Sequence, residues 1–151
     1  MIIRKAKPED LEGIVTFNIQ MAKETEGIIL DKKVVRAGVK SILDSSLIGF
    51  YLVAEENRNN KILCGQLLVI FEWSDWRNKN VWWIQNVYVD RKFRNKKVFS
   101  QLYRFTFKMA ASEENVAGLK LYVKKNNNFV KRIYELLGLT KVQYDLYEKS
   151  L

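Results

Sequence analysis

The sequence predicts an α/β fold in which a mixed, mainly antiparallel β-sheet is flanked by about four helices. The first observation behind this prediction is that apolar residues recur with a period of two in some segments and of three to four in others. The second is the resulting element order, βααβββαβαβ. The third is that no internal repeat and no Pro/Gly/Ser-rich linker divides the 151 residues. We therefore expect a single domain over residues 1–151.

The N-terminal part of the chain reads as one strand followed by two helices. Residues 2–6 read as a short strand, and Pro8 then opens a helix whose first turn is acidic. We expect a loop over residues 24–30, and Asp31 is predicted to cap a second helix that runs to about Ser45. The core-facing residues of the first helix recur at helical spacing: Leu11, Ile14, Phe17 and Met21.

The middle of the chain reads as three consecutive strands. Apolar and β-branched runs cover residues 50–54, 62–73 and 81–89, and polar turns at 55–60 and 74–80 separate them. Strands joined by such short turns pair with each other in antiparallel fashion. This part of the sequence therefore predicts the antiparallel centre of the sheet.

The C-terminal part alternates between helices and strands. A helical pattern over 98–112 is followed by a strand at Gly118–Val123 and a helix at Asn128–Leu137. Gly138 is the expected stop of that helix. We expect a last strand at Gln143–Tyr147, where apolar and polar residues alternate.

The segment 81–103 has the features of an anion-binding site. A buried strand leads into a basic loop, and the loop leads into the N-terminus of the helix that starts at Val98. Unpaired N–H groups and the positive end of the helix dipole meet there. The loop adds five cationic side chains: Arg91, Lys92, Arg94, Lys96 and Lys97.

Composition excludes several kinds of chemistry. The chain has no histidine and one cysteine, Cys64, which lies in an apolar run. Disulfides within the monomer are thus excluded, Ser–His machinery is absent, and no metal site is expected. The longest apolar run is far shorter than a membrane span, so we expect a cytoplasmic protein without a membrane partner. The net charge of +9 favours an anionic ligand, although a general bias toward Lys and Asn explains it equally well.

Two motifs resemble those of the GNAT N-acetyltransferase superfamily, and the likeness covers nearly the whole chain. The first is the acetyl-CoA pyrophosphate loop, usually Arg/Gln-x-x-Gly-x-Gly/Ala, which falls on Arg94-Asn95-Lys96-Lys97-Val98-Phe99. The second is an Asn followed seven residues later by Tyr and then Gly, here Asn127, Tyr134 and Gly138. Three further stretches are similar to one bacterial branch of the superfamily: Glu24-Thr25-Glu26-Gly27, Glu72-Trp73-Ser74-Asp75-Trp76-Arg77-Asn78, and Trp82-Trp83-Ile84-Gln85 with Val87-Tyr88-Val89.

The pyrophosphate loop departs from the family pattern at both glycine positions. Lys97 stands where the first glycine is expected, and Phe99 where the second small residue is expected. If the backbone φ at Lys97 is negative, lysine keeps the N–H and adds a cation for the phosphate. If φ is positive, a residue other than glycine costs about 1–2 kcal/mol and the loop shifts. The sequence leaves both alternatives open.

The resemblance implies that acetyl-CoA is the cofactor and assigns residues to it. The loop Arg94, Asn95, Lys96, Lys97, Val98 and Phe99 would hold the pyrophosphate. Backbone groups of Val87, Tyr88 and Val89 would hold the pantetheine, and a backbone N–H there would polarise the thioester carbonyl. Asn127 and Tyr134 would complete the site, with the Tyr134 phenol protonating the leaving thiolate. The alternative for Tyr134 is packing in the core at helical spacing.

The general base is less well defined. Strand alternation places Trp83, Gln85, Val87 and Val89 on one face, and relatives carry a glutamate at the position of Gln85. A glutamine cannot accept the proton. The remaining candidates are Glu72 and Glu26, acting directly or through water, and each is also explained as a solvated surface carboxylate.

The expected acceptor is a primary amine of a small molecule or a peptide. A cationic amine is repelled by a protein of charge +9 and needs local carboxylates, for which Glu24, Glu26, Glu72 and Asp75 are the candidates. Four tryptophans crowd residues 73–83, so we expect an aromatic pocket that binds an ammonium by cation–π contacts. The complete substrate-binding prediction is Glu24, Glu26, Glu72, Trp73, Asp75, Trp76, Trp83 and Gln85.

The sequence is compatible with three functions. The first is an active acetyl-CoA-dependent N-acetyltransferase that works by direct attack in a ternary complex. The second is a GNAT-shaped CoA- or ligand-binding protein without acetyl transfer, suggested by Lys97, Phe99 and Gln85. The third is an acetyltransferase acting on a nucleic-acid-linked amine, which the absence of interleaved aromatic and basic residues disfavours. The sequence leaves a homodimer open.

Overall fold

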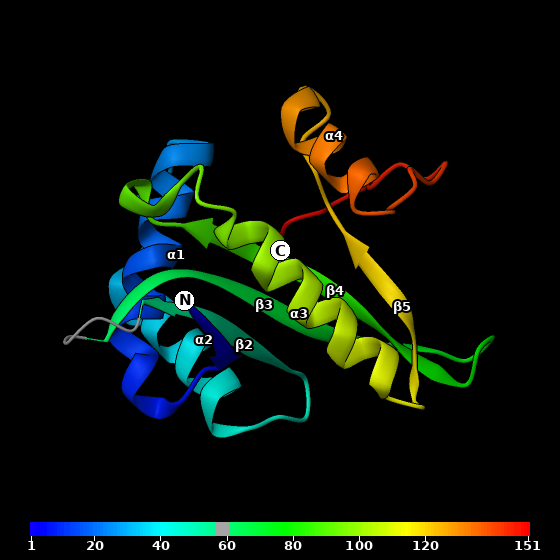
Figure 1. Ribbon diagram of the computed structural model, residues 1–151, viewed down its shortest axis with the longest axis horizontal. Coiled ribbons are helices and arrows are strands. Elements are labelled where there is room, and N and C mark those ends of the chain that lie inside the picture. Colours follow the sequence, from blue (N-terminus) through cyan, green and yellow to red (C-terminus); the bar gives the residue numbers. More distant parts are fainter. Residues whose placement is uncertain (57–60) are drawn as a thin grey trace. The chain divides into compact units, whose positions relative to one another are not determined.

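The structure, a computed structural model, describes residues 1–56 and 61–151 (Figure 1). The chain forms two compact units, Met1–Leu121 and Tyr122–Leu151. The first unit contains the sheet and most of the helices: β1 (Ile2–Lys5), the 3₁₀ turn η1 (Pro8–Asp10), α1 (Leu11–Glu26), α2 (Lys32–Asp44), β2 (Gly49–Glu56), β3 (Ile62–Ser74), β4 (Lys79–Val89), the 3₁₀ turn η2 (Arg91–Phe93), α3 (Val98–Ser112) and β5 (Val116–Leu121). The second unit contains α4 (Asn128–Leu136).

The sheet has the strand order β1-β2-β3-β4-β5. The pairs β1–β2, β2–β3 and β3–β4 are antiparallel, whereas β4 and β5 are parallel. A parallel pair needs a crossover, and α3 supplies it. In Figure 1, α3 passes in front of the strands, and α1 and α2 lie behind them. The predicted α/β class and mixed, mainly antiparallel sheet are confirmed.

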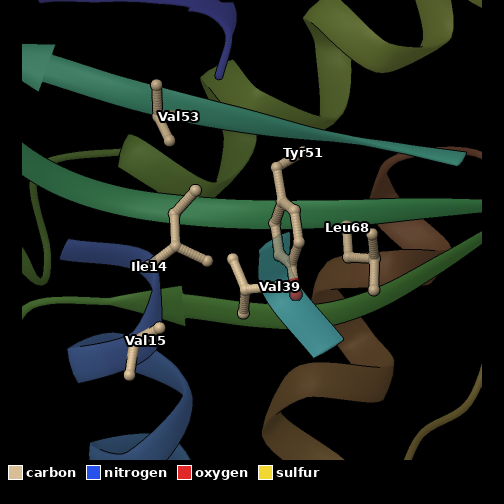
Figure 2. Packing of buried hydrophobic residues seen from close by; sticks show 6 residues of the cluster. All are labelled: Ile14, Val15, Val39, Tyr51, Val53 and Leu68. Carbon is tan, nitrogen blue, oxygen red and sulfur yellow. The ribbon is translucent and has the colours of Figure 1, made fainter. Parts of the chain in front are cut away.

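One face of the sheet packs against α1 and α2. Figure 2 shows the side chains that meet there: Ile14 and Val15 of α1, Val39 of α2, Tyr51 and Val53 of β2, and Leu68 of β3. The helical spacing predicted for α1 is confirmed, because Ile14 and Phe17 are buried and Leu11 packs against the cluster. Burying each such side chain contributes about 1.5–3 kcal/mol to stability.

The opposite face carries an aromatic cluster and α3. Phe50, Phe71 and Trp82 lie within 5.9 Å of one another by ring centroids. Trp82 is 5% exposed, so this tryptophan belongs to the core. The face also contacts α3, whose Val98 and Leu102 are buried.

An ion-pair network ties the start of the chain to the sheet. The Arg4 guanidinium donates to both carboxylate oxygens of Asp10, at 2.7 and 3.0 Å, and to Glu55 Oε2 at 2.7 and 2.9 Å. Asp10 and Glu55 are only 6% and 4% exposed. Burial alone would raise the pKa of the Asp10 carboxyl, but the bonds from Arg4 and from the Lys7 N–H outweigh it and lower that pKa.

Most predicted boundaries agree with the structure. Asp31 caps α2 by accepting from the N–H groups of Lys33 and Val34, and α3 covers the predicted residues. The predicted loop at 24–30 is partly wrong, because α1 continues through Glu26 and ends at Gly27, which adopts φ 69°. β5 begins and ends two residues earlier than predicted. The predicted turn at 55–60 is also partly wrong, since β2 extends through Glu56, and its residues 57–60 lie outside the described residues.

In the second unit, α4 is confirmed and the last strand is wrong. Asn127 Oδ1 accepts from the Val130 N–H at 3.2 Å and caps α4, and Gly138 follows its end with φ 87°. No strand follows α4 among the described residues. Residues 143–147 alternate as a strand would, but a strand forms only where it has a pairing partner, and local alternation does not supply one.

Candidate active site

An irregularity in β4 separates the two halves of this strand. Leu68 pairs with Gln85, and Gln66 pairs with Tyr88. Gln66 and Leu68 are two residues apart and share a face, so Gln85 and Tyr88 also share a face although they are three residues apart. Asn86 absorbs the extra residue with φ 47°.

The bulge corrects one expectation about this strand. Val87 and Val89 were predicted to share a face with Trp83 and Gln85, but the bulge places Tyr88 there instead. Simple alternation fails beyond Asn86 because the extra residue reverses the side-chain order. The described pairing with β5 ends at Ile84 and Leu121, so the backbone of residues 87–89 lies beyond this parallel ladder.

The basic loop after β4 is fixed to the sheet at its first residue. The Asp90 N–H donates to the Cys64 carbonyl at 2.9 Å, and the Asp90 carboxylate accepts from the Lys92 N–H at 2.9 Å. Phe93 is 9% exposed and lies under the Lys96 ammonium, 5.1 Å from the ring centroid. A buried side chain within an otherwise polar loop holds the backbone close to the sheet.

The loop reaches α3 through two residues in left-handed conformation. Asn95 has φ 62° and Lys97 has φ 60° and ψ 20°. Of the two alternatives for Lys97, the structure has the positive φ. The glycine of the family pattern would adopt this conformation without strain, whereas lysine pays about 1–2 kcal/mol. Lys97 is also the N-cap residue of α3.

Glu24, near the end of α1, holds two of the loop arginines. Its carboxylate accepts from Arg94 Nη2 at 2.7 Å and from Arg91 Nε at 3.1 Å. The Tyr88 hydroxyl donates to the same carboxylate at 2.8 Å, and Arg94 Nε donates to the Val89 carbonyl at 3.0 Å. The Arg94 guanidinium lies over the Tyr88 ring, 5.5 Å from its centroid. Glu24 was predicted to bind substrate, and the structure joins it to the predicted cofactor loop.

The ion pair between Glu24 and Arg94 stabilises the charged form of both side chains. The hydrogen bond from Arg94 is the main cause that lowers the pKa of Glu24, and the bonds from Tyr88 and Arg91 act in the same direction against partial burial. The bond to Glu24 raises the pKa of Arg94 further. Burial, followed by the Glu24 carboxylate, raises the pKa of the Tyr88 phenol. The Glu24 carboxylate and the Arg94 guanidinium are therefore charged at neutral pH.

Glu72 lies in a second cluster nearer the start of β4. Its carboxylate accepts from Lys120 Nζ at 2.9 Å and from Trp83 Nε1 at 2.5 Å. The Lys120 ammonium also lies over the Trp83 ring, 5.2 Å from its centroid. The bond from Lys120 is the main cause that lowers the pKa of Glu72. Glu72 and the Trp83 ring, both predicted to bind a substrate ammonium, thus surround the ammonium of Lys120 in this structure.

The structure does not bring all predicted acceptor residues together. Glu72 pairs with Val81, whereas Glu24 contacts Tyr88, and these two β4 residues lie roughly 20 Å apart along the strand. Trp76 is in the turn between β3 and β4 and is 92% exposed. The other predicted acceptor residues are spread along the same elements: Trp73 and Asp75 at the β3–β4 turn, Trp83 and Gln85 on β4, and Glu26 in the last turn of α1.

Residues 20–139 match the acetyltransferase (GNAT) family, which is more than half of the chain. The chain belongs to the GNAT acetyltransferase family. Among solved structures, a possible acetyltransferase from Clostridium difficile 630 is 38% identical, with a TM-score of 0.89 over 99% of this chain and 97% of the other. A search of curated proteins found no match.

Two more distant structures share the fold of this GNAT protein. Glucosamine-6-phosphate N-acetyltransferase from Arabidopsis thaliana is 21% identical, with a TM-score of 0.75 over 98% of this chain and 97% of the other. AAC(6′)-Iy, in complex with the bisubstrate analog CoA-S-monomethyl-acetylneamine, is 12% identical, with a TM-score of 0.76 over 99% and 97% of the two chains. Among residues 1–56 and 61–151 of the GNAT protein, no helix is long and apolar enough to cross a bilayer.

In the second unit of this GNAT protein, the predicted motif residues lie on and beside α4. Asn127 uses its side chain to cap the helix, and Tyr134 lies in its last turns. The Tyr134 phenol is partly buried, and this burial raises its pKa. The phenol therefore stays protonated well above neutral pH.

Sequence reasoning missed several residues of the candidate site. An asparagine within an apolar strand was a usable signal, because Asn tolerates the left-handed conformation that Asn86 adopts. Lys120 gave no such signal, because its ion pair with Glu72 spans 48 residues of sequence. Gln66 was also missed. It is fully buried, donates to Asn18 Oδ1 at 2.6 Å, and lies beside the bulge.

Proposed function

We propose that this GNAT protein transfers the acetyl group of acetyl-CoA to a primary amine of a small molecule or a peptide, by direct attack in a ternary complex. The observation that carries the proposal is the bulge at Asn86, followed by a cationic loop that leads into the N-terminus of α3. Family membership supports the acyl chemistry. On this proposal, residues 1–151 work as a single acetyltransferase domain.

The donor set of the loop fits a diphosphate. Arg94, Lys96 and Lys97 supply cations, and the backbone N–H groups that follow Lys97 open a helix of 15 residues. On this proposal the pyrophosphate is held by Arg94, Asn95, Lys96, Lys97, Val98 and Phe99. The backbone of Val87, Tyr88 and Val89 would hold the pantetheine, and Asn127 would complete the cofactor contacts.

When bound, acetyl-CoA supplies the thioester that the amine attacks. A backbone N–H in the segment 87–89 would donate to the carbonyl oxygen and stabilise the negative charge that develops on it. Tyr134 would donate its phenolic proton to the departing sulfur, so that the C–S bond breaks after the amine has formed the C–N bond. Its raised pKa suits this role, because the phenol carries a proton at neutral pH. Tyr134 is then reprotonated from solvent.

The proton of the attacking amine needs an acceptor. Glu72 has a lowered pKa and an ion pair with Lys120, so it is a weak base whose carboxylate suits cation binding. Glu26 is exposed in the last turn of α1. We propose that the amine loses its proton to water, with Glu26 or Glu72 receiving it, and that Gln85 orients the amine.

We propose that the acceptor binds along the Trp83 and Gln85 face of β4. Glu72 and Trp83 already surround the Lys120 ammonium, so the same pair of groups suits an ammonium of the substrate. Trp73, Asp75 and Trp76 contribute only if the acceptor extends to the β3–β4 turn. Glu24 is bonded instead to the loop arginines Arg91 and Arg94.

Lys97 favours a second candidate function, a CoA- or ligand-binding protein that does not transfer acetyl groups. Its left-handed backbone stores strain that the family glycine would relieve. A nucleic-acid-linked amine is less well supported, because Glu24 already neutralises part of the charge of Arg91 and Arg94.

The experiment is a thiol-release assay in which purified protein is mixed with acetyl-CoA and a panel of polyamines, amino sugars and peptides. Free CoA that forms only with an amine, together with the matching mass increase of 42 Da on that amine, supports the enzyme. Acetyl-CoA binding without amine-dependent release across the panel supports the binding protein.

A further inference from the structure

We propose that Glu24 is a positioning residue of the cofactor site, which orients Arg94 for the diphosphate of the acetyl donor. The inference rests on the proposed function, because it requires that the loop binds acetyl-CoA. It assigns Glu24 to the cofactor side, whereas the sequence predicted a contact with the acceptor.

Two anchors fix the Arg94 side chain. Glu24 Oε2 accepts from Nη2 at 2.7 Å, and the Val89 carbonyl accepts from Nε at 3.0 Å. The anchors come from α1 and from the end of β4, which are 70 and 5 residues away in sequence. The guanidinium group is planar, so two bonds set its plane, and the Nη1 edge is used by neither anchor.

Glu24 is itself held in place. Glu24 Oε1 accepts from the Tyr88 hydroxyl at 2.8 Å and from Arg91 Nε at 3.1 Å, and the Glu24 side chain is only 19% exposed. Tyr88 can reach Glu24 because the bulge at Asn86 turns it toward α1. The bulge, Tyr88, Glu24 and Arg94 thus form one connected support for the loop.

Two effects of Glu24 on phosphate binding oppose each other. A carboxylate repels a phosphate, which across several ångströms of water amounts to roughly threefold in affinity, and Arg91 offsets part of this charge. A free arginine side chain loses rotamer freedom when it is fixed by a ligand, and this loss can lower the affinity by as much as about 30-fold. Because Glu24 removes that cost before the cofactor arrives, we expect the ordering effect to be larger.

The test compares Glu24→Gln with Glu12→Gln. Both substitutions raise the net charge by one on the same helix, but Glu12 is exposed and pairs with Arg36 and Lys32. Each protein is assayed with acetyl-CoA and with acetyl-pantetheine, which has the same thioester but lacks the diphosphate. We expect Glu24→Gln to lower kcat/KM about tenfold for acetyl-CoA through KM, with kcat nearly unchanged. For acetyl-pantetheine we expect no change, and none with either donor for Glu12→Gln.

A second variant keeps the test valid if Glu24→Gln fails to fold. Arg94→Lys keeps the charge but cannot bond to Glu24 and Val89 in one plane. Its kcat/KM should fall about tenfold with acetyl-CoA and should not change with acetyl-pantetheine. Combining it with Glu24→Gln should add little, since both act on one contact. The inference is overturned if Glu24→Gln has an unchanged or higher kcat/KM for acetyl-CoA. It is also overturned if kcat/KM falls equally with both donors. Wild-type protein that uses neither donor instead overturns the proposed function.

Discussion

Gln85 and Tyr88 project from the same face of β4 although they are three positions apart along the strand. Asn86, with φ 47°, makes this arrangement possible. Its consequence is that β4 has two functions. The half before the bulge pairs with β5 as far as Ile84, and the half after it carries Tyr88 to Glu24 and leads into the cationic loop.

The bulge predicts that position 86 accepts only residues that tolerate a positive φ. Asn86→Val should lower the free energy of unfolding by about 1–2 kcal/mol, because a β-branched residue is strained at positive φ. Asn86→Gly should be within about 0.5 kcal/mol of wild type. Asn80→Val, at a β4 asparagine without positive φ, is the control and should have little effect. Urea denaturation measures all three, and equal stability of Asn86→Val and wild type would contradict the bulge.

The network of Arg4, Asp10 and Glu55 predicts that removing Arg4 causes a large, pH-dependent loss of stability. Arg4→Met should cost about 3–5 kcal/mol near neutral pH, because two buried carboxylates lose their partner. Arg36→Met, in the exposed pair with Glu12, should cost no more than about 1 kcal/mol.

The sign of the pH dependence follows from Asp10, whose pKa is lowered in the folded state. Its contribution is fully present above its unfolded pKa of about 4 and is lost as pH falls through the folded pKa. The difference between wild type and Arg4→Met should therefore shrink when denaturation is repeated at acid pH. A difference that stays constant from neutral to acid pH would show that the network is not the cause.

The fold could be predicted from the sequence to a large extent. Short apolar runs, the Asp31 cap and Gly138 are local signals, and the elements they predicted are present. The strand at 143–147 failed because a strand depends on a distant edge. The loop at 24–30 was only partly right, because the helix continued to the left-handed Gly27.

The candidate site was predicted less completely than the fold. The loop at 94–99 could be placed because its position follows from the strand and the helix on either side. The pairing of Glu24 with Arg94 and of Glu72 with Lys120 could not, since each bond joins residues brought together only by tertiary packing. The face of Tyr88 was predicted wrongly because periodicity carries no information about a bulge.

The Glu72 cluster predicts that a substitution there changes acceptor binding and leaves acetyl-CoA binding as it is. Glu72→Gln should raise the KM for a cationic amine about three- to tenfold, because the carboxylate that faces the ammonium is lost. The Kd of acetyl-CoA should not change. Glu12→Gln, at an exposed residue of α1 that pairs with Arg36 and Lys32, is the control with the same change of charge and should leave both values as they are. Steady-state kinetics and calorimetry separate the two; a weaker Kd for acetyl-CoA would contradict the assignment.

Tyr134 predicts an effect on the chemical step. Tyr134→Phe removes the proton donor but keeps the ring, so kcat should fall about 100-fold while acetyl-CoA binding stays the same. Tyr144→Phe, at a residue that is 89% exposed, is the matched control. Pre-steady-state measurement of CoA release checks this, and a Tyr134→Phe enzyme with wild-type kcat would assign the residue to packing instead.

The most direct test of the central claim is a calorimetric titration of acetyl-CoA into wild type, Lys97→Gly and Lys96→Gly. Lys97→Gly removes the strain at φ 60° but also a cation, whereas Lys96→Gly removes a cation at a position without positive φ. If the loop is a working cofactor site, wild type binds acetyl-CoA in the micromolar range, and Lys97→Gly stays within a few-fold of it. Wild-type protein that binds no acetyl-CoA, with binding restored only by Lys97→Gly, would contradict it.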